Sequence, residues 1–340
     1  MARDLDRSVV SLGMIVRADF GRGLAHQTYS FWSHLKPDVT VVIDNREIDH
    51  NADPDNPDAA WPLQFDRYPG AIVSPWKGYT APLSTEAIEA LRSTDLVYTA
   101  ETHYDESLQT HPSILHVNPE FYRGAQATQY WYGTSWKPID LPPGEIVPTP
   151  IDDEDLVSEV PGPGRILHVA GHRAAGDRNG TNIVTALMRD MEFEWKLAHQ
   201  DGLRLHPRSM QKTVLATRPE DRWSIYEDCS ILAYPRRYGG QSLQVNEAMA
   251  RGLAVVMSDV EPNPETWPII PVPSRPGGNV RTPGGRIPLA QVLTRPFRQI
   301  LSELVDPATL HQHQTASLEW ARANTWSQWL PRIRALIDAC

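Results

Sequence analysis

The chain has 340 residues, of which 41% are hydrophobic and 22% are charged, and its formal net charge at pH 7 is −10. This is the composition of a globular protein, and the length suits two domains of about 150 residues each. No run approaches the roughly 18 apolar residues of a membrane-spanning helix. The first residues alternate charges and lack the apolar core of a signal peptide, so we expect a cytoplasmic protein. The two cysteines, Cys229 and Cys340, are too few for a disulfide framework or a zinc cluster.

The charge is distributed unevenly along the chain. Residues 1–150 hold about 11 basic and about 20 acidic side chains, whereas the remainder is nearly balanced. An acidic first half repels polyanions, so a large nucleic-acid footprint is disfavoured there. A local basic cluster in the second half weakly favours nucleic-acid binding; it is made of Arg204, His206, Arg208 and Lys212.

In the first half, short apolar runs alternate with helical patterns. We expect strands at residues 8–16, 38–43, 70–74, 95–100 and 113–118. Helices are expected at residues 24–35 and 84–93, the second with Ser84 as its N-cap. Strands that alternate with helices predict a parallel, doubly wound sheet.

Residues 136–164 are rich in proline and interrupt this pattern, so we interpret them as the crossing between two domains. The alternation then restarts, with strands expected at 165–170, 194–199, 231–235 and 253–258. Helices are expected at 181–191, 219–229 and 242–251, and amphipathic helices with core-packing tryptophans at the C-terminus. We therefore predict an α/β protein with two doubly wound, Rossmann-like domains and a ligand cleft between them.

Residues 234–259, YPRRYGGQSLQVNEAMARGLAVVMSD, join one buried strand to the next through a glycine loop and a short helix. Ser242 is placed as the N-cap of this helix, and Gly252 follows its end. In a parallel sheet such a helix begins at the carboxyl edge, where its backbone N–H groups and dipole favour an anion. The loop glycines let a ligand approach the backbone, although the same pattern also forms tight turns that bind nothing.

A family resemblance is carried by three stretches of the second half. They are HVAGHRAAGDRNGTNIVTAL, RPEDRWSIYEDCSILAYP and the glycine loop with its Glu-Ala-Met-Ala helix. They are similar, in this order, to the nucleotide-sugar domain of GT-B glycosyltransferases, in particular the retaining glycosyltransferase family four. ANTWSQWLPRI is similar to the family's last helix, and GRGLAHQTYSF and DLVYTAETHYD match more loosely. The resemblance implies an N-terminal Rossmann-like acceptor domain (1–150), a C-terminal Rossmann-like nucleotide-sugar domain (151–315) and a helix that crosses back (316–340).

For the second domain, the resemblance implies a donor site for a nucleotide diphosphate sugar. Arg173 matches the family's phosphate-binding arginine, and Arg178 lies beside the position of its lysine. Glu247 matches a glutamate that accepts hydrogen bonds from the ribose; the structural alternative is an ion pair with a neighbour such as Arg236. Gly239 stands where the family has another glutamate, at the donor-sugar end. The remaining donor-binding positions are Gly240, Gln241, Ser242 and Leu243.

For the first domain, the resemblance implies that a glycine loop faces the donor. Gly21 and Gly23 precede a helix there and are assigned to donor binding, and Asp19 is assigned to the acceptor side. His103 matches a histidine that contacts the donor sugar in the family. Glycine pairs are common at βα turns, and loop histidines and arginines are often simply solvated. These assignments therefore depend on where the side chains lie.

The resemblance implies a metal-independent, retaining glycosyltransferase that moves a sugar from a nucleotide diphosphate sugar, such as a UDP-sugar, to a hydroxyl acceptor. Its catalytic residues would be Arg173, Arg178, His103 and Glu247, with no cofactor besides the donor. The acceptor would be a glycan, a protein or a small molecule. Gly239 in place of a glutamate motivates a second hypothesis, a GT-B module that binds nucleotide or glycan without turnover. A third hypothesis, which the acidic first half disfavours, is a glycosyltransferase that modifies hydroxylated bases in DNA.

Two other kinds of segment remain. The acidic motifs at 53–55 and 152–155 have neither a preceding strand nor the register of a calcium loop, so we interpret them as loop and linker charge. Residues 261–288, rich in glycine, proline and arginine, have no good counterpart in the family. We expect them to form a lid over the donor or a surface decoration.

Overall fold

A computed structural model describes residues 10–20, 23–46, 63–78, 82–171, 177–199, 205–217, 221–240, 242–260 and 267–340. The chain divides into two compact units. Unit 1 comprises Met1–Gly133, Leu141–Thr149 and Trp329–Cys340, and unit 2 comprises Thr134–Asp140 and Pro150–Gln328. Within the described ranges, none of the helices is both long enough and apolar enough to cross a membrane.

Unit 1 is built on a seven-stranded sheet in the order β3-β2-β1-β4-β5-β6-β7, in which the described pairs are parallel. Its strands are β1 (Leu12–Arg17), β2 (Val39–Asp44), β3 (Ile72–Pro75), β4 (Leu96–Ala100), β5 (Ser113–Val117), β6 (Gln129–Tyr132) and β7 (Glu145–Ile146). The central strands β1, β4 and β5 are buried along their whole length. The strand order switches direction between β1 and β4, so the carboxyl ends of these two strands mark the switch point.

Two helices of unit 1 lie where the sequence predicts them. α1 (Gly23–Leu35) packs on β1, and α2 (Thr85–Arg92) packs on β1, β2 and β3. The Ser84 side chain accepts a hydrogen bond from the Ala87 N–H at 3.3 Å, which confirms the predicted N-cap. The strand β7 is a correction, because it lies inside the passage predicted to serve only as a crossing. It pairs with β6, and the Val147 N–H just after it donates to the Tyr132 carbonyl at 2.8 Å.

Unit 2 is built on a six-stranded parallel sheet in the order β10-β9-β8-β11-β12-β13. Its strands are β8 (Arg165–Gly171), β9 (Trp195–His199), β10 (Thr213–Thr217), β11 (Cys229–Tyr234), β12 (Ala254–Ser258) and β13 (Ile270–Val272). The helices that follow β8 along the chain are α3 (Thr181–Asp190), α4 (Pro207–Met210), α5 (Leu243–Ala250), α6 (Thr294–Glu303), α7 (Pro307–Ala323) and α8 (Trp326–Ile337), and most of α8 belongs to unit 1. Here the strand order switches between β8 and β11.

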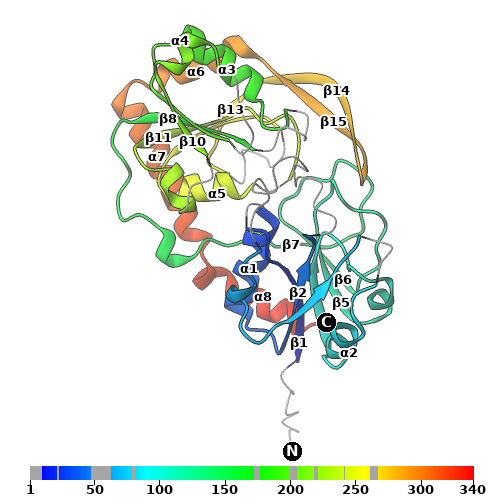
Figure 1. Ribbon diagram of the computed structural model, residues 1–340. Coiled ribbons are helices and arrows are strands. Elements are labelled where there is room, and N and C mark those ends of the chain that lie inside the picture. The colour runs from blue at the N-terminus through cyan, green and yellow to red at the C-terminus, as the bar shows by residue number, and fades with distance from the viewer. Residues whose placement is uncertain are drawn as a thin grey trace, which may run out of the picture. The chain divides into compact units, whose positions relative to one another are not determined.

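Different helices cover the two faces of the unit 2 sheet. On one face, α5 and α7 contribute Val245 and Ala321 to an apolar core. On the other face, α3 and α6 contribute Leu187 and Phe297 to a second core. α3 contacts both α4 and α6, and the three helices are seen together in Figure 1. Two parallel α/β sheets, this one with helices on both faces, confirm the predicted fold class.

The segment predicted as a helix at 219–229 forms only the short 3₁₀ helix η7 (Arg222–Ile225). The Asp221 side chain accepts a hydrogen bond from the Trp223 N–H at 3.0 Å and so starts this turn. Asp228 then adopts a left-handed φ of 58°, which ends any helix before β11. Local hydrogen bonding and a change of backbone hand therefore overrule the helical pattern of the sequence.

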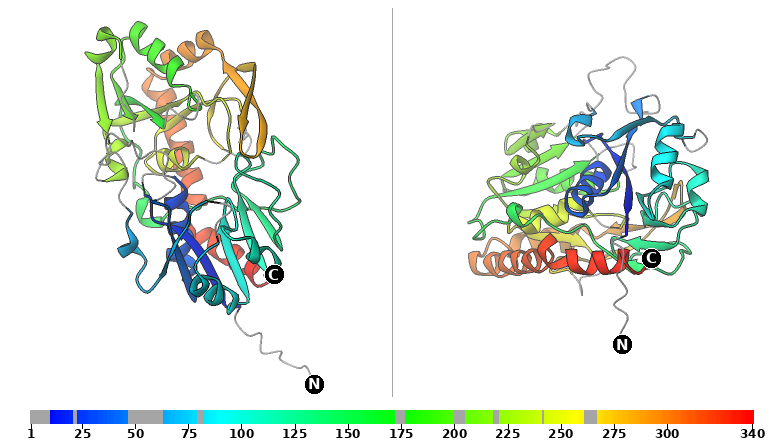
Figure 2. Two further views of the ribbon diagram at one scale, coloured as in Figure 1. Left: turned by 45° about the vertical axis from the view of Figure 1, so that its right-hand side comes forward. Right: turned by 90° about the horizontal axis from the view of Figure 1, so that it is seen from below.

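The inserted segment at 261–288 is, where described, an ordered β structure. After β13, the chain forms a long antiparallel hairpin of β14 (Ser274–Thr282) and β15 (Gly285–Val292), seen in Figures 1 and 2. Ile287 of β15 is fully buried in a cluster with Trp136 and Tyr238 of the same unit. This apolar contact fixes the hairpin to the loop that follows β11.

The C-terminal segment is helical, as the sequence predicts. α7 begins after Asp306, whose carboxylate accepts a hydrogen bond from the Thr309 N–H at 2.9 Å. Trp326, the first residue of α8, is 1% exposed. The ring of Trp320 packs against the ring of Trp267, with centroids 5.5 Å apart. Trp326 therefore packs in the core, in agreement with the sequence prediction, whereas Trp320 and Trp329 are only partly buried.

Candidate active site

The loops that follow β8 and β11 are tightly joined at the carboxyl edge of the unit 2 sheet. The Arg237 N–H donates to the Arg178 carbonyl at 2.8 Å, which links one loop to the other. Gly180 has a φ of 73°, and a β-carbon at this position would overlap the carbonyl oxygen of Pro235. Only glycine fits at this crossing. Because β8 and β11 flank the switch point of the sheet, the loops stand where α/β proteins bind ligands.

Gly239 is enclosed by two arginine side chains. A β-carbon at residue 239 would lie 2.5 Å from Nη2 of Arg178 and closer still to Nη2 of Arg236. The glycine also has a φ of 116°, which strains any other residue. The two Nη2 atoms are therefore at most about 5 Å apart, close enough to act on one anion together.

Arg236 is a residue that the sequence assigned only as an alternative ion-pair partner. It is 2% exposed, and its Nη1 donates a hydrogen bond to the Gly240 carbonyl. Arg178 lies over the ring of Tyr238, with its Cζ atom 5.4 Å from the ring centroid. The signal in the sequence was the position of Arg236, directly after the proline that follows β11, at the sheet edge where α/β proteins bind ligands.

The start of α5 differs in one detail from the prediction. Ser242 occupies the N-cap position, but its side chain accepts no capping hydrogen bond. Its hydroxyl donates instead to Oε1 of Gln244 at 2.7 Å and lies 3.1 Å from the phenol oxygen of Tyr234. Because Ser242 does not cap α5, its side chain takes none of the first-turn N–H groups of this helix. Leu243 is the first residue of the helix.

Glu247 lies on α5 and faces η7. It accepts a hydrogen bond from the Tyr226 hydroxyl at 2.5 Å, and its Oε1 is 3.9 Å from Nη1 of Arg222. Burial raises the pKa of Glu247, although Arg222 and the Tyr226 hydroxyl oppose the shift. The ion-pair partner is thus Arg222, so the suggested pairing with Arg236 was wrong. The carboxylate, whose side chain is 16% exposed, retains acceptor capacity on its accessible part.

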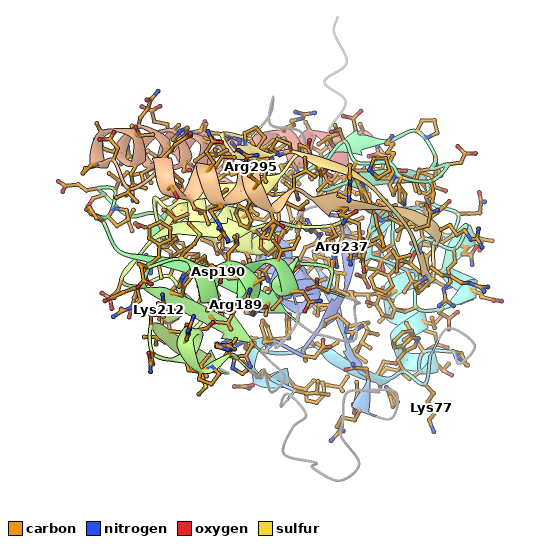
Figure 3. The ribbon with its side chains drawn as sticks, turned by 90° about the horizontal axis from the view of Figure 1, so that it is seen from above. Lys77, Arg189, Asp190, Lys212, Arg237 and Arg295 are labelled. Carbon is orange, nitrogen blue, oxygen red and sulfur yellow. The ribbon has the colours of Figure 1, made fainter. Side chains whose placement is uncertain are left out.

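The hairpin of the inserted segment lies beside these loops. The Ala290 N–H donates to the Arg237 carbonyl at 2.7 Å, and Nε of Arg237 donates back to the Ala290 carbonyl at 3.3 Å. The Arg237 side chain is labelled in Figure 3. Together with the burial of Ile287 against Tyr238, these bonds fasten β15 next to the residues that enclose Gly239.

In unit 1, the predicted residues Asp19 and His103 are both buried. Asp19 forms a two-pronged ion pair with Arg17, at 3.0 Å to Nε and 2.7 Å to Nη2. Nε2 of His103 is hydrogen-bonded to the Gln126 carbonyl, and burial lowers the pKa of the ring. Burial therefore favours the neutral form of His103, and its ring is hydrogen-bonded within its own unit. Gly23 is exposed at the start of α1.

The structure brings some of the predicted residues together. Arg178, Gly239 and Gly240 lie in one group, with Ser242 and Leu243 at the adjoining helix start. Glu247 lies further along α5 and turns to η7. Three predicted residues, Arg173, Gly21 and Gln241, fall outside the described residues.

The acidic motif at 152–155 has structural partners. Asp153 accepts a hydrogen bond from the Ser327 hydroxyl at 2.7 Å, and Asp155 pairs with Nη2 of Arg222 at 2.9 Å. Burial raises the pKa of Asp155 to about 6. Across the described part of the chain, no group of three His, Cys, Asp or Glu side chains is arranged to hold a metal ion.

No family model matches this sequence, and no curated protein matches it. Solved structures do. A structure of Anabaena HepE in complex with UDP has a TM-score of 0.65 at 9% identity, over 97% of this chain and 100% of that one. Sucrose-phosphate synthase from Thermosynechococcus elongatus has a TM-score of 0.60 at 12% identity, over 97% of this chain and 100% of that one. A glycosyltransferase from Rickettsia africae has a TM-score of 0.59 at 11% identity, over 96% of this chain and 97% of that one. The chain thus has the fold of GT-B glycosyltransferase structures.

Proposed function

We propose that the protein is a glycosyltransferase that moves a sugar from a nucleotide diphosphate sugar to a hydroxyl acceptor, with retention and without a metal ion. The observation that carries the proposal is the convergence of Arg178 and Arg236 on Gly239 at the carboxyl edge of a parallel sheet. The fold shared with glycosyltransferase structures supports it.

The chemistry requires cations at this place. When a sugar leaves a nucleotide diphosphate, negative charge develops on the diphosphate, and fixed positive groups stabilise the transition state more than the ground state. Guanidinium groups suit this role because their planar forks bind phosphate oxygens in pairs. Arg178 and Arg236 supply two such groups, and the adjacent start of α5 adds backbone N–H groups and a favourable dipole.

The remaining roles follow from the motif resemblance. Glu247 accepts hydrogen bonds from the ribose, Arg173 adds a phosphate contact, and Gly240 with Gln241 binds the donor sugar. By the same resemblance, His103 remains a predicted contact to the donor sugar. We propose UDP as the nucleotide, as in the HepE complex, and a leaving diphosphate that itself takes the acceptor proton. A glycan, protein or small-molecule hydroxyl is the acceptor.

The test is nucleotide release from UDP-, GDP- and dTDP-sugars without acceptor. Slow release from one donor is expected, reduced about 100-fold by Arg178→Ala or Arg236→Ala, since each variant removes a preorganised cation. Arg189→Ala is the matched control, because Arg189 is exposed and pairs with Asp190 at 3.0 Å at the end of α3 (Figure 3). Arg173→Ala and Glu247→Ala test the residues carried over from the family.

Gly239 itself favours a second candidate, a GT-B module that binds a nucleotide or glycan without turnover, because residue 239 carries no carboxylate and its φ of 116° strains any residue that could supply one. In that case UDP raises the melting temperature of the protein, while no donor in the panel releases nucleotide even with glycan acceptors present. Any acceptor-independent or acceptor-dependent turnover excludes this candidate.

A further inference from the structure

The carboxyl edge of the unit 1 sheet carries a polar cluster of its own. Arg17 is the last residue of β1 and Asp19 follows it, Asn45 follows β2, and Glu101 follows β4. β1 and β4 are the strands between which the order of this sheet switches, so the cluster occupies the position at which doubly wound sheets bind ligands. Three of its members are less than one-tenth exposed: Arg17, Asp19 and Asn45.

The members of the cluster interact with one another. Asp19 binds Arg17 through both oxygens, and Nδ2 of Asn45 donates to Oδ2 of Asp19 at 3.5 Å. Nδ2 of Asn118 donates to Oε1 of Glu101 at 3.1 Å. Burial raises the pKa of Glu101, while the nearby charge of Arg17 opposes this shift and that of Asp19 adds to it. Glu101 and the Arg17–Asp19 pair therefore belong to one electrostatic group.

Asn45 also contributes an unused acceptor to this group. Asn45 is 2% exposed, and within the described ranges its Oδ1 has no hydrogen-bond donor. A buried carbonyl oxygen without a donor is costly, and in a native site it is commonly satisfied by a ligand or a water molecule. Glu101 also has a φ of 66°, a conformation that non-glycine residues adopt mainly where the surroundings impose it.

The other edge of the same sheet shows what purely structural carboxylates look like here. Asp38 accepts a hydrogen bond from the Leu12 N–H at 2.8 Å, and Asp95 accepts from the Ser11 N–H at 2.9 Å. Each of these carboxylates satisfies the backbone at the start of β1. The carboxylates at the carboxyl edge bind side chains instead, and Asn45 retains an unsatisfied acceptor beside them.

We propose that this cluster, defined by Arg17, Asp19, Asn45 and Glu101, binds an uncharged, hydroxyl-rich molecule, namely a neutral sugar. Its role as the acceptor site rests on the proposed transferase function. The groups that the cluster offers, Oδ1 of Asn45 and the carboxylates, are hydrogen-bond acceptors, which suit hydroxyl donors. The two carboxylates outnumber the one guanidinium, so a phosphate or carboxylate on the ligand is repelled.

The experiment is saturation-transfer NMR without any donor, so that its result does not depend on turnover. The probes are methyl α- and β-glycosides of glucose, galactose and mannose, methyl glucuronoside, and glucosamine. We expect at least one neutral glycoside to bind at millimolar concentration and the glucuronoside not to bind. Asn45→Ala should weaken that binding about tenfold, the effect of one lost hydrogen bond to a buried group. Asp95→Asn, at the other edge of the sheet, should leave it unchanged.

A second variant separates a ligand contact from a packing defect. Glu101→Gln keeps the shape of the side chain and removes one negative charge, so it should weaken the neutral glycoside and allow the glucuronoside to bind. Melting curves identify a variant that does not fold. The proposal is overturned if no neutral glycoside binds, if the glucuronoside or glucosamine binds more tightly than every neutral probe, or if Asn45→Ala and Glu101→Gln bind as the wild type does. Nucleotide release tests the transferase proposal independently, so the two failures are distinguishable.

Discussion

The guanidinium groups of Arg178 and Arg236 both reach Gly239, so that their Nη2 atoms occupy the space in which a side chain of residue 239 would begin. The two arginines come from different loops, one after β8 and one after β11. The missing side chain at residue 239 therefore leaves room for both cations, and the electrostatics of this loop depend on its absence.

Gly239→Ala should destabilise the fold and reduce nucleotide binding together. The φ of 116° costs about 1–3 kcal/mol for a residue with a β-carbon, and the added methyl group must displace both guanidinium groups. The unfolding free energy in urea and the affinity for UDP, measured by calorimetry, give the two readouts.

Gly240→Ala is the matched control for this prediction. A β-carbon at residue 240 would have its nearest neighbour, Cε3 of Trp136, at an ordinary 3.5 Å. We expect a change in stability within about 0.5 kcal/mol, because the added methyl group meets only ordinary contacts. Equal effects of the two substitutions would contradict the steric explanation.

Tyr226→Phe should destabilise unit 2 by about 1–3 kcal/mol, because it leaves the buried Glu247 carboxylate without its closest donor. The pKa of Glu247 should rise further, since the Tyr226 hydroxyl now lowers it. Chemical denaturation measures the first effect. Tyr122→Phe, in which a half-buried hydroxyl loses a 3.3 Å bond to the Ala125 carbonyl, is the control and should change stability by less than about 1 kcal/mol.

His168 should make stability depend on pH. It is fully buried between the Ala233 carbonyl and the Thr181 hydroxyl, and burial lowers its pKa to about 4. The unfolded chain takes up this proton near pH 6.5, so the stability contribution is complete above that pH and is lost as the pH falls toward 4.

The slope that His168 adds is about 1.4 kcal/mol per pH unit within this window. His168→Gln should lower the slope of the unfolding free energy against pH by this amount, because the unfolded variant no longer takes up a proton at residue 168. The slope is measured by denaturation at a series of pH values. A variant whose slope between pH 4.5 and pH 6 equals that of the wild type would show that His168 protonates in the folded state.

Ile287→Ala tests whether the hairpin is an integral part of unit 2. Ile287 is fully buried against Trp136 and Tyr238, so its truncation should cost about 2–5 kcal/mol. Val214→Ala, at a side chain that is 44% exposed, should cost little. A hairpin that is only loosely attached would give similar melting temperatures for both variants.

Much of the fold could be predicted because buried parallel strands read as short apolar runs and because helix signals, such as Ser84, are local. The failures have physical reasons. β7 has only two residues and depends on pairing with β6, which no local pattern encodes. The helix predicted at 219–229 stops after one turn, because Asp221 and Asp228 favour a different backbone.

The site was less accessible to sequence reasoning. The position of the glycine loop at a sheet edge follows from the strand and helix pattern, but its partners come from distant parts of the chain. Arg178 and Arg236 are 58 positions apart in number and meet only through the packing of two loops. The partner of Glu247 was misassigned for the same reason, because Arg222 approaches it from η7 rather than from the neighbouring loop.

The crowding around Gly239 also limits how this protein can change over generations. A glutamate at residue 239 would have to displace the guanidinium groups of Arg178 and Arg236, and it would have to adopt a φ of 116°, which is strained for any residue with a β-carbon. Loss of Arg236 would relieve the closest of these contacts but would also remove a buried cation. We therefore expect the effects of substitutions at residues 236 and 239 to be non-additive.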